Sequence, residues 1–143
     1  MILLTHSFIA WKGNRKKTEP YELTDANYQQ AIWDKLVYPS SNIRLVICGH
    51  ECHPTTDYFE TVGFRTDKNA AGKSVAQMMF NAQAEGGGWE GNGGDGWLRV
   101  LEFHPDGRTV TVHTFSPLLG IIPSTVGISL RTEPYDHFSF TLD

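Results

Sequence analysis

The chain has 143 residues, which is enough for about one domain. Its composition is 40% hydrophobic, 20% charged and 12% aromatic, and this balance excludes a disordered chain, collagen and a coiled coil. Lysine and arginine number 12 against 16 acidic residues, so the charge offers nucleic acid no general binding patch. The apolar runs are too short for a membrane span, and the first residues do not resemble a secretory signal.

The first half of the chain predicts a strand, a helix and a second strand. Residues 2–5 form a continuous apolar run before His6, which favours a strand buried on both faces. Apolar residues recur at helical spacing between 26 and 37. A second apolar run over 43–48 ends just before the Gly-His pair that contains His50. Together they make a βαβ unit, whose strands we expect to be parallel.

The second half of the chain predicts mostly antiparallel strands. Two segments with clear alternation flank a Pro-Asp-Gly turn, which is typical of a β-hairpin. A Gly-rich stretch over 85–96 separates this hairpin from the strands before it. The expected strands span residues 58–64, 73–83, 97–104, 108–115 and 137–142, and the pattern of the second is ambiguous.

A small basic cluster lies in the polar loop over 11–23. It consists of Lys12, Arg15, Lys16 and Lys17. Such a cluster is typical of a solvated loop, and it would equally suit a surface that meets an anionic substrate. Both interpretations stay open on the sequence.

Three histidines follow the two strands that we expect to be parallel. His6 comes after the first strand, His50 after the second, and His53 three residues later. Because the carboxyl ends of parallel strands share the edge where open α/β sheets place their ligands, we expect His6 and His50 to converge. Gly49 would allow a tight turn beside a ligand. Neutral imidazole binds zinc, iron, manganese and similar ions, so these residues predict a metal site; the alternative is hydrogen-bonded histidines at the edge of the core.

Other motif matches favour structural roles. Residues 91–96 fit Gly-x-Gly-x-x-Gly, but they open a strand rather than a helix and do not predict dinucleotide binding. Ser7 lacks the Gly-x-Ser-x-Gly elbow of a serine hydrolase. Cys48 lies within an apolar strand and is expected to be a small core residue. The remaining histidines are expected to be solvated or structural: His104, His113 and His137.

An ordered series of segments runs through most of the chain. It begins with an apolar strand that ends in Thr5-His6, a crossover helix, and a strand that ends in Gly49-His50-Glu51-Cys52-His53. It continues with residues 75–79, the Gly-rich stretch, 96–99, the 103–107 hairpin and 114–117. This series resembles the carboxyl half of calcineurin-like metallophosphoesterases, in particular a bacterial branch with some secreted or envelope-bound members. The compartment of the parent protein stays open.

The resemblance implies an α/β/β/α metallophosphoesterase sandwich, of which residues 1–143 would be a single domain and the carboxyl-terminal half. It implies two divalent metal ions (zinc, manganese or iron), with His6 and His50 on one metal and His53 on the other. The family spaces its last two histidines as Gly-His-x-His, so Cys52 falls at the second position and stays an alternative to His53. The implied reaction is hydrolysis of a phosphate ester by a metal-activated hydroxide.

The family's Asp-x-His, Gly-Asp and Gly-Asn-His motifs do not occur in this chain in the family's order, so we assign no catalytic residue. Two functions stay open. The chain supplies the carboxyl-terminal histidines of a phosphoesterase whose other ligands lie on a longer parent chain or in a complex. Alternatively, it is a truncated, inactive domain that binds one metal or none, and its open sheet edges favour a homo-oligomer. The class of phosphate ester is open.

Overall fold

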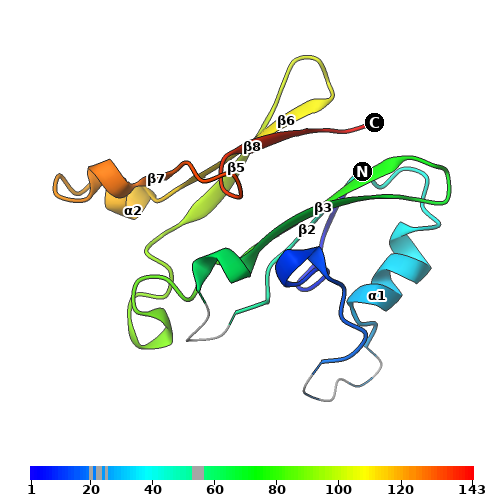
Figure 1. Ribbon diagram of the computed structural model, residues 1–143, viewed down its shortest axis with the longest axis horizontal. Helices are drawn as coiled ribbons and strands as arrows, with labels where there is room; N and C mark the ends of the chain where they lie inside the picture. Colours follow the sequence, from blue (N-terminus) through cyan, green and yellow to red (C-terminus); the bar gives the residue numbers. More distant parts are fainter. Residues whose placement is uncertain (20, 22–23, 25, 53–56) are drawn as a thin grey trace. The chain divides into compact units, whose positions relative to one another are not determined.

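The computed structural model describes residues 1–143 except 20, 22–23, 25 and 53–56. The chain divides into two compact units. The first unit comprises residues 1–51, 60–80 and 142–143, and the second comprises 52–59 and 81–141. Among the described residues, each unit contains one β-sheet, and the helices are few and short (Figure 1). The chain is therefore mixed α/β, which confirms the predicted class in its coarse form.

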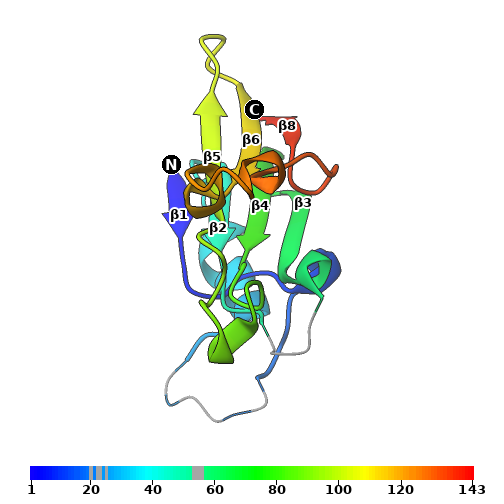
Figure 2. The same ribbon diagram turned by 90° about the vertical axis from the view of Figure 1, so that its left-hand side faces the viewer.

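The sheet of the first unit has four strands. Their order is β1 (Ile2–Leu4), β2 (Leu45–Cys48), β4 (Ser74–Phe80) and β3 (Val62–Lys68), and Figure 2 shows them side by side. β1 is parallel to β2, as predicted for the βαβ unit. β4 is also parallel to β2, while β3 is antiparallel to β4. The β3–β4 hairpin thus extends the first sheet, and β4, between β2 and β3, is buried along most of its length.

The helix between β1 and β2 is shorter than the apolar pattern predicts. α1 spans Gln29–Ile32 and continues into a π-helical turn, Trp33–Val37. Tyr28 before it is extended, so the helix does not reach residue 26. This segment packs on one face of the first sheet, and its main buried cluster is Phe8, Ile9, Trp33, Val37, Ile43, Val46, Cys48, Val75 and Met79. Burial of Cys48 confirms its predicted place in the core.

The sheet of the second unit is antiparallel around the strand β6 (Thr109–Phe115). β6 pairs with β5 (Leu98–Phe103) on one side, and with β7 (Leu130–Arg131) and β8 (Phe138–Thr141) on the other. The predicted hairpin is confirmed. Its turn is held by Asp106, whose carboxylate accepts from the backbone N–H groups of residues 108 and 109.

Two parts of the chain differ from the sequence prediction. Tyr58–Thr61 forms a 3-10 turn, so the strand predicted over 58–64 is wrong in its first half, and β3 begins at Val62. The short helix α2 (Pro117–Gly120), capped by Ser116, and the two-residue β7 were not predicted. Within the described part of the chain, no helix is long and apolar enough to cross a membrane.

Candidate metal centre

His6 and His50 come together at the carboxyl edge of the first sheet. Each lies two residues beyond the end of its parallel strand. The backbone ladder continues past the strands, because Thr5 donates to the carbonyl of Ile47 and Gly49 donates to the carbonyl of His6. The ring centroids of the two histidines are 4.5 Å apart. The predicted convergence of these histidines is thus confirmed, while their role as metal ligands stays a prediction.

His50 has a strained backbone. Its φ is +72°, in the left-handed region that side chains other than glycine seldom adopt. The sequence predicted the tight turn at Gly49, but the left-handed residue is His50. Gly49 relieves a close approach instead: a Cβ there would make a tight contact, 3.3 Å from the carbonyl oxygen of Phe80. Strain of this kind persists where the surroundings impose it, and functional sites often store it.

Two carboxylates and a lysine surround His50. The ligand atoms of Glu19, His50 and Glu51 all lie within 4.8 Å of one another. The Lys16 ammonium donates to Glu51 Oε2 at 2.6 Å and to Glu19 Oε2 at 3.4 Å. Burial lowers the pKa of Lys16, but its interactions with Glu51 and Glu19 outweigh burial and the net pKa is raised. The lysine is therefore charged at neutral pH and balances part of the negative charge.

Gln29 links the two loops that carry the histidines. Its side chain is 1% exposed. Its Nε2 donates to Ser7 Oγ at 2.8 Å and to Glu51 Oε1 at 2.9 Å, and its Oε1 accepts from the Lys16 backbone N–H at 2.8 Å. Ser7 follows His6 directly, and Glu51 follows His50. A buried amide with these three hydrogen bonds fixes both loops and the Lys16 backbone with respect to one another.

Two further site residues were expected from the sequence, His53 and its alternative Cys52. His53 lies outside the described residues. Cys52 belongs to the second unit, where burial raises the pKa of its thiol and a hydrogen bond to the backbone of Ala84 opposes that rise. Among the described residues, the group of three donors close enough to share one cation is Glu19, His50 and Glu51.

The basic cluster of the 11–23 loop is not one continuous surface. The Arg15 side chain is only 6% exposed, its guanidinium hydrogen-bonds Asp67 and Gln77, and it stacks on the ring of Trp33 at 4.0 Å. Arg15 is therefore part of the core. Lys16 points instead to the carboxylates beside His50, so of these two residues only Lys16 is placed to act at the site.

The donor set around His50 fits a divalent cation. It offers two carboxylates and an imidazole, with the ring of His6 adjacent. Carboxylate oxygens together with imidazole nitrogens suit manganese, iron and zinc. The Tyr21 hydroxyl lies 2.9 Å from His50 Nε2 and orients that ring. Apart from the two histidines, sequence analysis singled out none of these donors: Glu51 could have been noticed inside the histidine motif, whereas no spacing rule points to Glu19.

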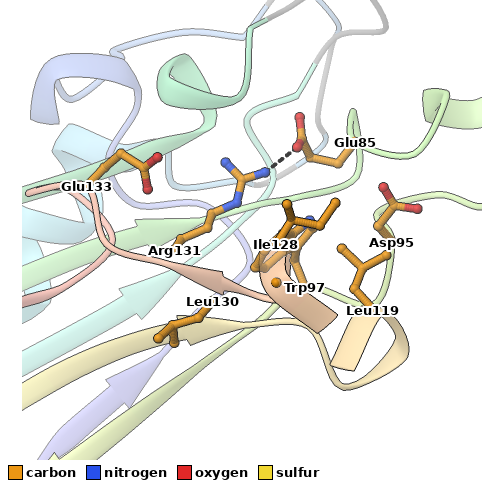
Figure 3. Close-up of a pocket in the computed structure, with 9 residues that line it drawn as sticks. Glu85, Asp95, Trp97, Leu119, Ile128, Leu130, Arg131 and Glu133 are labelled. Carbon is orange, nitrogen blue, oxygen red and sulfur yellow. Dashed lines mark hydrogen bonds and ion pairs between the residues drawn. The ribbon is translucent and has the colours of Figure 1, made fainter. Parts of the chain in front are cut away.

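The second unit contains a different charged feature, a pocket of about 380 Å³. Figure 3 shows Arg131 reaching toward Glu85, with which it forms an ion pair. The Arg131 guanidinium also lies 3.8 Å from the ring centroid of Tyr58 and 4.3 Å from that of Trp97. The lining is Glu85, Asp95, Trp97, Leu119, Gly127, Ile128, Leu130, Arg131 and Glu133. The described part of this lining contains neither histidine nor cysteine, so it does not resemble the donor set around His50.

A buried ion pair lies elsewhere in the same unit. Asp136 is fully buried, and its Oδ1 accepts from Arg99 at 2.9 Å and from the Tyr58 hydroxyl at 2.6 Å. Burial, followed by the hydrogen bond to Asp136, raises the pKa of Tyr58, so the phenol stays protonated and donates.

A second histidine pair is formed by His113 and His137, whose ring centroids are 4.9 Å apart.

Comparison with known proteins gives no match: no protein-family model, no curated protein and no solved structure matches this chain. The family resemblance of the motifs therefore stays a proposal, which the geometry of the first unit supports.

Proposed function

We propose that this chain is part of a metal-dependent phosphoester hydrolase of the calcineurin-like type, to which it contributes His6 and His50 as ligands. The observation that carries this proposal is the pairing of the two imidazoles beyond adjacent parallel strands, with ring centroids 4.5 Å apart. Open α/β sheets bind ligands at this edge. The order of the later motifs, which resembles that family, supports the same proposal and the sandwich fold that goes with it.

The residues of the chain would orient and balance the centre. A bound divalent cation supplies Lewis acidity toward a phosphate oxygen and lowers the pKa of a bound water. Gln29 holds the two histidine loops in register through Ser7 and Glu51. Tyr21 fixes the ring of His50 from one side. Outer partners of this kind commonly matter for metal affinity, because they set the direction of the ligand nitrogen.

The decisive measurement is the metal content of the protein purified without chelator and then incubated with Zn²⁺ or Mn²⁺. We expect about one tightly held equivalent per chain, as for a site with an open coordination position. His6→Ala and His50→Ala should each lose it. His113→Ala is the matched control, because it removes one member of the other histidine pair, and it should retain the metal.

Two results would overturn the proposal. One is a wild-type chain that holds no metal even after incubation. The other is a metal that His113→Ala loses and His50→Ala retains. If the metal is held as expected, release of p-nitrophenol from p-nitrophenyl phosphate and from its bis-ester distinguishes monoesterase from diesterase activity, with His50→Ala as the inactive reference.

A second candidate function is self-association without catalysis, and the edge strand β1 favours it. β1 lies at one end of the first sheet and pairs with β2. Ile2 is 45% exposed and Leu4 is 72% exposed. An edge with exposed apolar side chains can accept a further strand. Light scattering after size exclusion would show a dimer that Leu4→Lys dissociates, and a monomeric wild type would exclude this candidate.

A further inference from the structure

We propose that Lys16 is an exchangeable counter-ion of the group formed by Glu19, His50 and Glu51: its ammonium balances the carboxylates when no metal is bound and moves away when a divalent cation binds. The inference rests on the metal centre of the proposed function and adds to it a device that controls cation entry. It also assigns Glu19 and Glu51, which the family's motifs do not include, as ligands beside His50.

Lys16 already contacts donor atoms that a bound metal ion would need. Its Nζ lies 2.6 Å from Glu51 Oε2 and 3.4 Å from Glu19 Oε2. The donor atoms of both glutamates lie within 4.8 Å of a ring nitrogen of His50. A single ammonium thus contacts two of the three donors that a metal ion would use. A metal ion bound to both carboxylates and the Lys16 ammonium cannot keep the same contacts at once.

The two glutamates are more deeply buried than the lysine that balances them. The Glu19 side chain is 5% exposed and that of Glu51 is 16% exposed, whereas Lys16 is 36% exposed. Two nearly buried carboxylates need a positive partner, since an uncompensated buried charge is strongly unfavourable. The lysine can leave for water without moving its backbone, because its charge sits on a flexible stem and the side chain is partly exposed.

The backbone around the group stays in place during this exchange. Gln29 accepts from the Lys16 N–H and donates to Glu51 Oε1. It therefore holds one oxygen of Glu51 while the other oxygen changes partner from ammonium to metal. The exchange then needs only rotations of the Lys16 side chain, and the ligands remain oriented.

The neighbouring residues offer a matched pair for the test. Lys16→Met removes the ammonium and keeps the length and apolar stem of the side chain. Lys17→Met makes the same change in net charge at the adjacent, exposed position. Calorimetric titration with Mn²⁺ alone should show tighter binding to the Lys16→Met protein, by about tenfold or more because a like charge next to the cation is gone. Lys17→Met should bind as the wild type does.

A measurement on the wild-type protein covers the case in which Lys16→Met fails to fold. Brief acetylation with acetic anhydride, read by peptide mass spectrometry, reports how free each lysine is. Addition of Mn²⁺ should raise the modification of Lys16 several-fold and leave that of Lys17 unchanged. Equal modification of Lys16 with and without bound Mn²⁺ would overturn the exchange.

The outcomes separate this inference from the proposed function. If the wild type binds Mn²⁺ and Lys16→Met binds it no more tightly than Lys17→Met does, the exchange is wrong and the metal centre stands. If Lys16→Met binds Mn²⁺ and the wild type does not, Lys16 is the counter-ion and the wild-type centre of the proposed function is wrong. If neither protein binds Mn²⁺, both are overturned.

Discussion

Two ion-paired groups, one in each unit of the chain, balance largely buried carboxylates with different cations. In the first unit, Glu19 and Glu51 face the ammonium of Lys16 beside His50. In the second unit, Asp136 faces the guanidinium of Arg99, whose side chain is 4% exposed. The Lys16 side chain is partly exposed to solvent, whereas Asp136 and Arg99 are enclosed by protein. A partly exposed lysine suits a pair that can exchange its partner, whereas an enclosed arginine suits a pair that holds the fold.

Arginine suits the closed pairing for physical reasons. Its guanidinium is planar, always charged and able to stack on aromatic rings, and it is less strongly hydrated than an ammonium. Arg131 shows the same use in this unit, with Tyr58 and Trp97 at 3.8 and 4.3 Å from its guanidinium. An ammonium is compact and flexible, so it gives up a carboxylate more easily.

Removal of Asp136 should have the largest effect. Asp136→Ala leaves Arg99 buried without its carboxylate and the Tyr58 hydroxyl without its acceptor. Breaking a buried pair in this way costs about 3–5 kcal/mol of unfolding free energy. Glu19→Ala is the counterpart in the first unit and should cost about 1 kcal/mol or less, because Lys16 can turn to solvent. Urea unfolding of both variants measures the difference, and equal costs would contradict the contrast between the units.

Replacing an arginine by lysine in the second unit, or Lys16 by arginine in the first, should have the next largest effect on stability. Arg131→Lys keeps the charge beside Glu85 but loses the planar stacking on Tyr58 and Trp97, at a cost of about 1–2 kcal/mol. Lys16→Arg keeps the charge beside Glu51 and should change stability by about 0.5 kcal/mol or less, as at a partly exposed position. The comparison is thermal unfolding of the two proteins at the same pH and salt. A Lys16→Arg protein that loses as much as Arg131→Lys would mean that the lysine is as fixed as the arginine.

Some elements of the fold could be predicted from the sequence, and others could not. Hydrophobic runs predicted β1, β2 and the β5–β6 hairpin, because burial on one or both faces has a period that can be read locally. Convergence of His6 and His50 followed from the rule that parallel strands end at one edge. Tertiary pairing was not readable in this way: nothing local places β4 parallel beside β2.

Charges were harder to predict than the apolar pattern. Arg15 and Lys16 are adjacent in one basic cluster, yet Arg15 enters the core beside Asp67 and Lys16 meets Glu51. Glu19 has no motif around it. Such pairings depend on residues far apart in the chain, so neither spacing nor composition predicts them. The meeting of His6 and His50 could be predicted, whereas the ion pairs beside them required the structure.

Relief of backbone strain at His50 should have a smaller effect on stability, and of opposite sign. His50→Gly and His50→Ala both remove the imidazole, but only glycine adopts a φ of +72° without steric cost. The glycine variant should therefore be more stable than the alanine variant by about 1 kcal/mol. Urea unfolding of the two variants without metal makes the comparison. Equal stabilities would show that the loop relaxes and that His50 is not held in strain.

The effect of acid on the Asp67 ion pair should be the smallest. It tests whether firm pairing depends on the kind of cation or on the unit that contains it. Asp67, in the first unit, has arginine partners. Burial raises the pKa of its carboxyl, but hydrogen bonds from Arg65, Gln77 and Arg15 outweigh burial and lower the pKa to about 2. The unfolded chain therefore takes up this proton first as the pH falls. The contribution is present above about pH 4, the ordinary range of an aspartate, and is lost toward pH 2.

The measurement for Asp67 is the free energy of unfolding between pH 5 and pH 2.5 in the wild type and in Asp67→Asn. The wild type should lose up to about 1 kcal/mol more than the variant, a small value because the carboxylate is partly open to solvent and screened. Arg15 stacks on Trp33 as Arg131 stacks on Trp97, so this pair should behave as a fixed one. If the unfolding free energies of the two proteins change in parallel with pH, the stacked arginines of the first unit do not hold their carboxylates. The difference between firm and exchangeable pairs would then depend on the unit and not on the cation.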